Sequence, residues 1–231
     1  ATIERVYREL FKNAGGARLT IVGNVDPEAI KPMVEKYIGS IAKNKKARKL
    51  DEANFINFAK GNVDKTVELV MATPKSTVFQ VYSAYMPVDT KTEVALKVAN
   101  YILDMIYTKT IREDEGGTYG VSTMAEISGE PKPEFAILII FDTDKSKAPK
   151  LIELAKQGLK DIAQNGPNAE YVTKARENMI KAFPEKQIHN SYWHNLAYQW
   201  YSHGRNNFNN YVETIEKVAT PESIQKFVQE I

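Results

Sequence analysis

The chain contains three histidines, His189, His194 and His203, and no cysteine. A catalytic zinc site needs about three protein ligands that converge on one ion. On one continuous helix, His189 and His194 are about 140° apart around the axis, and His189 and His203 are roughly 21 Å apart along it. No two of them can then meet at one ion, and neither H-E-x-x-H nor H-x-x-E-H occurs. The chain alone therefore offers no zinc site, and the lack of cysteine excludes disulfides and thiolate nucleophiles.

Other catalytic patterns are equally weak. No serine lies in G-x-S-x-G, so a serine hydrolase is not indicated. The adjacent acids Glu113, Asp114 and Glu115 could serve as a general acid and base, but three neighbouring carboxylates more often form a solvated turn. The segment 21–27 has one glycine where a dinucleotide fingerprint needs three, so a tight turn before a helix capped by Asp26 is the better interpretation.

An aromatic stretch covers residues 190–211 and is also rich in asparagine. It could form a sugar-binding platform, or a pair of helices whose aromatic rings pack inward while the amides face water. We expect the inward packing. The aromatic residues are Tyr192, Trp193, Tyr198, Trp200, Tyr201, Phe208 and Tyr211.

The charged segment 110–120 holds the remaining candidates. Arg112 is a permanent cation with a fork of donors that suits carbonyl or carboxylate oxygens. Tyr119 offers a hydroxyl donor, and Gly117 and Gly120 on its two sides allow a ligand or backbone to approach closely. Together these donors could hold a peptide carbonyl or the oxyanion that develops from it. The alternative is that Arg112 only caps the end of the preceding helix.

The composition excludes several classes of partner. The chain has 231 residues, 43% hydrophobic and 26% charged, with a formal net charge of +2, which gives no reason to expect nucleic acid or an anionic membrane. No apolar run approaches the roughly 18 residues of a membrane span, and the first residues do not form a signal peptide. The compartment stays open between periplasm and cytoplasm, with a bacterial-type soluble protein favoured.

The apolar pattern predicts an α+β fold, a mostly antiparallel sheet with long helices packed on one face. The run 135–141 is apolar on both faces and should be a central strand. Four main strands are expected between residues 66 and 141, and helices 90–109 and 146–164 should share one face. The expected helices are 2–13, 27–38, 90–109, 146–164 and most of the chain beyond, and the expected strands are 18–22, 66–71, 77–86, 121–127 and 135–141, with an extended connection over 40–62.

Two segments carry a resemblance to a known family. Residues 19–30, LTIVGNVDPEAI, followed by VEKYIGS at 34–40, resemble the strand, turn and helix that open the second subdomain of each half of pitrilysin/insulysin-type zinc peptidases, the inverzincins. The spacing to TIREDEGGTYG at 110–120 also matches, because in that family a long helix ends in an Arg-Glu segment followed by Gly and Tyr. The resemblance covers essentially the whole chain and is strongest over residues 17–165.

The resemblance implies a role for this chain in a larger enzyme. Such peptidases, which include mitochondrial processing peptidase, consist of two homologous halves around a chamber, and one half carries H-x-x-E-H and zinc. The other, non-catalytic half supplies an Arg and a Tyr that reach the substrate. By motif these are Arg112 and Tyr119, which are catalytic and substrate-binding candidates, with Gly117 as a further substrate-binding residue. No cofactor is expected in this chain, and zinc is expected in the catalytic half.

The resemblance also implies a domain division and two possible functions. Residues 1–16 would be the tail of a helix from a preceding subdomain, and residues 17–231 the C-terminal peptidase-family α+β domain, which stops within a helix. The favoured function is the substrate-binding, non-catalytic domain of a zinc metalloendopeptidase, whose partners are a peptide substrate and the HxxEH-bearing half, in the same chain or in a partner subunit. The alternative is a non-enzymatic structural or interaction module of the same fold. The chain alone would be inactive.

Overall fold

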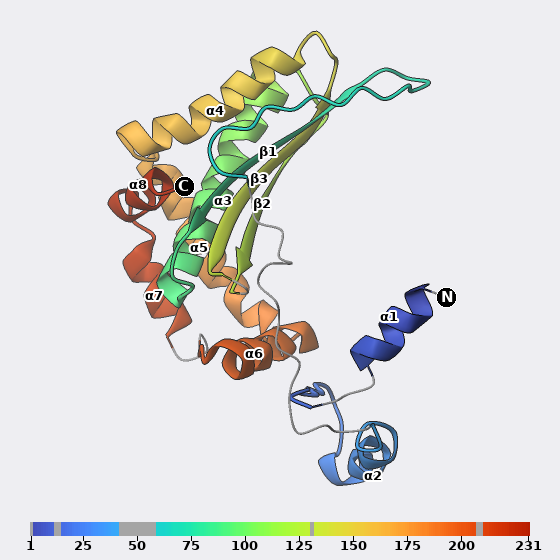
Figure 1. Ribbon diagram of the computed structural model, residues 1–231. Helices are drawn as coiled ribbons and strands as arrows, with labels where there is room; N and C mark the ends of the chain where they lie inside the picture. Colours follow the sequence, from blue (N-terminus) through green and yellow to red (C-terminus); the bar gives the residue numbers. More distant parts are fainter. Residues whose placement is uncertain (1, 12–14, 42–58, 130–131, 207–209) are drawn as a thin grey trace. The chain divides into compact units, whose positions relative to one another are not determined.

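The computed structural model describes residues 2–11, 15–41, 59–129, 132–206 and 210–231 (Figure 1). These residues form two compact units, and each is described by itself. The first unit comprises described residues within 1–55 and 187–204, and the second comprises described residues within 56–186 and 205–231. The predicted boundary between residues 16 and 17 stays a prediction.

The second unit is built on an antiparallel sheet of three strands in the order β1-β3-β2 (Figure 1). The strands are β1 (Ser76–Tyr85), β2 (Val121–Ser128) and β3 (Glu134–Thr143). The central strand β3 pairs Phe141 with Val78 of β1 and with Val121 of β2. This confirms that the run 135–141 is a central strand, as its apolar residues on both faces predict.

Helix α3 (Thr90–Tyr107) fills the centre of this unit. It begins at the N-cap Asp89, whose side chain accepts a hydrogen bond from the Thr92 backbone N–H at 2.8 Å. Apolar residues lie on more than one side of it, and Leu96, Ile102 and Leu103 are all fully buried. Because β2, α4, α5, α7 and α8 all contact α3, it is enclosed between the sheet and the other helices.

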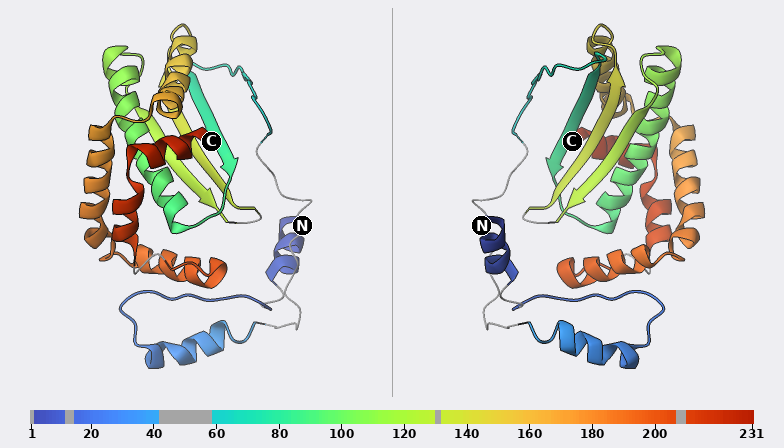
Figure 2. Two further views of the ribbon diagram at one scale, coloured as in Figure 1. Left: turned by 90° about the vertical axis from the view of Figure 1, so that its left-hand side faces the viewer. Right: turned by 90° about the vertical axis from the view of Figure 1, so that its right-hand side faces the viewer.

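The other helices of the second unit are α4 (Ala148–Asn165), α5 (Ala169–Lys186), α7 (Tyr211–Val218) and α8 (Pro221–Gln229). Figure 2 shows the helices of this unit over one face of the sheet. Helices α3 and α4 share that face, as predicted. The α+β arrangement with helices on one face is thus confirmed.

The second face of the sheet is open and partly apolar. Phe79, Val81, Tyr85 and Met124 are 65%, 45%, 51% and 41% exposed. The register places Phe79 and Val81 opposite Ile140 and Leu138 of β3, which are only partly buried. The apolar residues of β3 that face the helices are therefore buried, whereas Leu138 and Ile140 on the open face are only partly buried.

The first unit contains α1 (Thr2–Phe11), α2 (Pro27–Tyr37) and α6 (Asn190–His203). Helix α2 begins as predicted, since the Asp26 carboxylate accepts from the Glu28 backbone N–H at 2.9 Å and Pro27 occupies the first turn. The Arg18 guanidinium donates to the Tyr201 carbonyl of α6 and lies 5.8 Å from the centre of the Tyr201 ring.

The predicted inward packing of the aromatic stretch is wrong for α6. This helix has no buried residue, and Trp193, Tyr198, Trp200 and Tyr201 are between 40% and 58% exposed. The helix also carries no charged residue, so its aromatic rings and amides share the surface. The prediction is correct for Tyr211 of α7, which is buried, while Phe208 lies outside the described residues.

Two predicted strands are absent from the described residues. Residues 18–22 and 66–71 have no strand assignment, and the sheet has three strands where four were expected. Their alternating apolar residues remain exposed, for example Leu19 at 53% and Leu69 at 77%. A strand forms only where a neighbour completes its hydrogen-bond ladder, and alternation alone does not supply one. Residues 42–58 of the predicted connection and 12–13 of the first predicted helix lie outside the described residues.

We expect Tyr107→Phe to lower the free energy of unfolding by about 1 to 2 kcal/mol, because the buried Tyr107 hydroxyl donates to the Ala155 carbonyl of α4 at 2.7 Å. Burial raises the pKa of Tyr107. The folded state therefore keeps the proton that an unfolded tyrosine releases near about pH 10, so the advantage of Tyr over Phe should be complete below that pH and shrink above it. Urea unfolding of both proteins at about pH 8 and about pH 10.5 measures this. Equal stability of the two proteins at the lower pH would contradict it.

Candidate functional site

The segment that carries Arg112 is helical. Residues Thr108–Asp114 continue α3 as a π-helix, η2, where the sequence predicts a helix end at 109 and then a loop. The Thr110 hydroxyl donates to the Ile106 carbonyl at 2.9 Å, a side-chain bond of the kind that bends helices. The wider turn keeps Ile111 fully buried while residues 112–114 face solvent. Single π-helical turns are rare and occur often at functional sites.

Arg112 is exposed at the end of η2. Within the described part of the chain, its side chain makes no hydrogen bond or ion pair, so the proposal that it only caps helix carbonyls has no support there. The neighbouring acids Glu113 and Asp114 are exposed as well, and Glu115 pairs with Lys150 of α4 at 2.5 Å. The three carboxylates thus do not form a shared buried site, which agrees with a solvated segment.

Gly117 is the buried point of the loop that follows. Its N–H donates to the Ile111 carbonyl at 3.2 Å, and its own carbonyl accepts from the Thr143 hydroxyl at 2.5 Å. A Cβ at this position would lie 2.6 Å from a methyl carbon of Leu151, which is itself buried, so only glycine fits. Gly117 therefore packs against Leu151 and is bonded to Ile111 and Thr143, and its expected contact with substrate stays a prediction.

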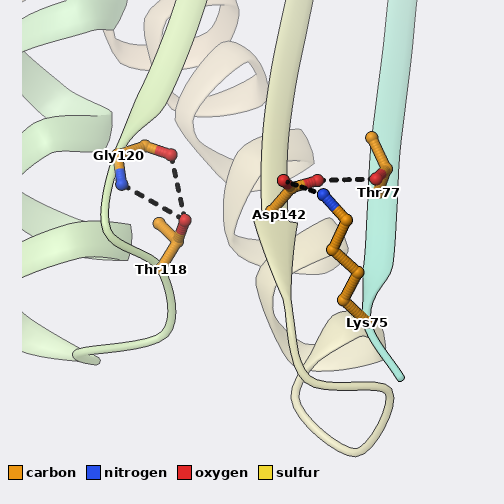
Figure 3. A network of polar contacts seen from close by, with 5 residues as sticks. All are labelled: Lys75, Thr77, Thr118, Gly120 and Asp142. Atoms are coloured by element: carbon orange, nitrogen blue, oxygen red, sulfur yellow. Dashed lines mark hydrogen bonds and ion pairs between the residues drawn. The ribbon is translucent and has the colours of Figure 1, made fainter. Parts of the chain in front are cut away.

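Tyr119 lies at the tip of a short turn beyond Gly117. The Thr118 hydroxyl donates to the Gly120 carbonyl at 2.9 Å and accepts from the Gly120 N–H at 3.3 Å, so the residues on both sides of Tyr119 are tied together (Figure 3). The Tyr119 side chain is fully exposed, at 101%. The turn fixes the backbone beneath the ring and leaves the phenol hydroxyl free to donate.

The end of β3 beside this loop is fixed to β1. Asp142 accepts from Thr77 and from Lys75, each at 2.6 Å, and Figure 3 shows these bonds together with the Thr118 turn. These hydrogen bonds, first the one from Lys75 and then the one from Thr77, lower the pKa of Asp142. Because strand residues alternate, Asp142 faces the open side of the sheet while the next residue, Thr143, faces the helices.

The sequence marks Arg112 and Tyr119 as candidates but gives no sign of the residues that hold their segment in place. Thr143 and Leu151 are far along the chain from the loop, and nothing in their local pattern sets them apart from ordinary strand and helix residues. The only local signal was Gly117 itself, since a glycine beside a charged segment can mark a close approach. Only the tertiary structure determines which atoms come close to Gly117.

Among the described residues there is neither a group of side chains that could hold a metal ion nor a helix that could cross a membrane. Nowhere among them do three or more His, Asp or Glu side chains gather in a group that could hold a metal ion. Helices long and apolar enough to cross a membrane are also absent from the described ranges.

Comparison with known proteins gives the family. The model of the peptidase M16 inactive domain matches residues 2–179. The probable zinc protease PqqL of Escherichia coli strain K12 is 23% identical over 181 residues, which are 78% of this chain and 19% of that protein. This chain therefore spans about a fifth of the length of that relative.

Solved structures agree on the fold. The periplasmic protease PqqL from Escherichia coli matches 90% of this chain with 23% of its own, at a TM-score of 0.70 and 19% identity. A protease from Helicobacter pylori matches 90% of this chain with 50% of its own, at a TM-score of 0.66 and 12% identity. The ferredoxin protease FusC, solved as a mutant in complex with Arabidopsis ferredoxin, matches 90% of this chain with 22% of its own, at a TM-score of 0.63 and 15% identity.

We expect Gly117→Ala to destabilise the second unit by about 1 to 3 kcal/mol, because the new methyl group overlaps the buried Leu151 side chain. Gly120→Ala is the matched control, since its Cβ would meet no atom within 4 Å and its φ is not positive. It should stay within about 0.5 kcal/mol of the unmodified chain. Denaturant unfolding of the three proteins measures the difference, and equal losses for both variants would show that Gly117 is not confined.

Proposed function

The chain belongs to the peptidase M16 family as an inactive domain, and from this premise we propose that it binds peptide substrate for a zinc-dependent endopeptidase. The observation that carries the proposal is the paired exposure of Arg112 and Tyr119. Both side chains reach solvent from a segment whose backbone is tied into the core at Ile111 and Gly117. A purely structural domain has no need of two free donors on an anchored turn.

The two donors suit different parts of hydrolysis. The Arg112 guanidinium attracts a peptide carbonyl in the ground state and in the transition state alike, so its main effect is on binding. The Tyr119 hydroxyl can donate to the oxygen on which negative charge develops as water attacks, and that bond strengthens in the transition state. Tyr119 is therefore the proposed transition-state contact, and Arg112 the proposed positioning contact for the substrate.

The zinc and the water that attacks would come from the partner half. Family membership supports an HxxEH-bearing half, either elsewhere in the same polypeptide or in a partner subunit. When bound there, zinc would polarise the scissile carbonyl and activate water. The periplasm is the proposed compartment, on the strength of the periplasmic relative from Escherichia coli.

A non-enzymatic interaction module is the second candidate, and one observation favours it. The open face of the sheet exposes Phe79, Val81 and Met124, and an apolar face of this kind is typical of an interaction surface. The two functions differ in what they require of Tyr119. An interaction module would tolerate the loss of its hydroxyl, whereas a peptidase would not.

We expect Tyr119→Phe in the full-length protein to lower kcat by about 100- to 1000-fold, because one oxyanion donor is lost. Zinc content and fold should not change, since the Tyr119 side chain is fully exposed. Arg112→Ala should raise KM in addition to any loss in kcat. The measurement is steady-state cleavage of a fluorogenic peptide library with zinc analysis of each variant.

Tyr85→Phe is the matched control for this experiment. Tyr85 is about half exposed and lies at the opposite end of β1 from Ser76, which pairs with Thr143. Its loss of a hydroxyl should leave kcat and KM unchanged. Full activity of the Tyr119 variant would refute the catalytic assignment and leave the interaction module as the better function.

We also expect the 231-residue chain by itself to bind no stoichiometric zinc and to cleave no peptide, because it lacks an HxxEH motif. Metal analysis after chelation and zinc addition, followed by the same peptide assay, measures this. One bound zinc per chain with turnover that a chelator abolishes would contradict it.

A further inference from the structure

Among the described residues, Thr143 is the one polar or charged residue whose side chain is buried. It ends β3, faces the helices and is 7% exposed. A valine would fill the same space in a strand, since it has the same branched shape. Burying a hydroxyl is unfavourable unless it is hydrogen-bonded, and Thr143 meets this condition through its bond to the Gly117 carbonyl.

Gly117 links both proposed substrate contacts to this hydroxyl. Its N–H bonds to the carbonyl of Ile111, the residue before Arg112, and its chain continues through Thr118 into Tyr119. Gly117 is therefore the buried root of the loop, with Arg112 before it and Tyr119 after it, and the loop enters β2 at Val121, which pairs with Phe141.

The other contacts of the loop are weaker anchors. Lys147 donates to the Gly116 carbonyl at 3.2 Å and Lys150 pairs with Glu115, but both lysines are exposed, and exposed ion pairs stabilise little. Thr118 bonds only to Gly120, two residues away, so it shapes the turn without attaching it to the sheet.

Thr143 itself is held firmly. The preceding residue, Asp142, is bonded to Thr77 and Lys75 of the β1 end, and the Cα of Thr143 pairs with that of Ser76 across the ladder. A continuous series of bonds thus leads from β1, through the end of β3, to the root of the loop that carries Tyr119.

We propose that Thr143 is a positioning residue, whose hydroxyl acts through the Gly117 carbonyl to hold Tyr119 and Arg112 in place. The inference rests on the proposed function of those two residues. A donor that is misplaced by about 1 Å can cost on the order of 100-fold in rate, so the position of an exposed tyrosine needs such a buried anchor. Replacing the hydroxyl by a methyl leaves a buried carbonyl without its donor and releases the loop.

Hydrogen exchange on the 231-residue chain tests the structural part. Thr143→Val should speed the exchange of backbone amides 115–120 about tenfold, with Val172 and its neighbours in α5 as an internal reference for global stability. Thr143→Ser keeps the hydroxyl and should exchange as the unmodified chain does. Thr123→Val is the matched control, because the Thr123 hydroxyl bonds to Asn100 and Asp104 and not to the loop. Unchanged exchange of 115–120 in Thr143→Val would overturn the inference.

A double-mutant cycle in the full-length protein tests the functional part. Thr143→Val should lower kcat about tenfold when Tyr119 is present and should not lower kcat further in the Tyr119→Phe background, and Thr143→Ser should restore activity. Equal losses in both backgrounds would show that Thr143 does not act through Tyr119. Full activity of Tyr119→Phe alone would overturn the proposed function and with it the catalytic part of this inference, while the exchange experiment still decides whether Thr143 holds the loop.

Discussion

The burial of α3 on more than one side is the constraint on which the second unit depends. A helix with apolar residues around most of its surface cannot lie on an open face of the molecule, so it must be enclosed. The sheet covers one side, and α5, α7 and α8 contact it as well. Each fully buried leucine or isoleucine of α3 contributes about 1.5 to 3 kcal/mol relative to exposure, so the enclosure of this helix stabilises the unit strongly.

The candidate site is the exposed continuation of that buried helix. Helix α3 passes directly into η2, where Ile111 is the last residue that remains in the core and Arg112 is the first that leaves it. The loop then returns to the core once, at Gly117 against Leu151, before it rises to Tyr119. An exposed side chain on such a base can be placed accurately, because the backbone beneath it has little freedom.

The proposed function requires a second, zinc-bearing half of the enzyme. This chain matches an inactive peptidase domain and spans about a fifth of its relative from Escherichia coli. Under the proposed function it would supply hydrogen-bond donors and a scaffold, and the zinc chemistry would belong to the other half. Such a division would account for a site with two hydrogen-bond donors and no metal ligands among the described residues. It would also account for the exposed side chains of Arg112 and Tyr119, which make no hydrogen bond or ion pair among the described residues.

The sequence by itself determined the features that depend on residue type and local period. Four features could be predicted directly: the missing cysteines, the absent HxxEH motif, the two-sided apolar run of β3 and the buried pattern of α3. Arg112 and Tyr119 could be named only as candidates. Tertiary structure decided which alternating segments became strands, because residues 18–22 and 66–71 have no ladder partner in the described structure. It also decided that the helix continues beyond α3 as η2 to Asp114, that Gly117 lies against Leu151 and that the Thr143 hydroxyl donates to the Gly117 carbonyl. These outcomes depend on atoms that are brought together from distant parts of the chain, and neither local period nor propensity contains that information.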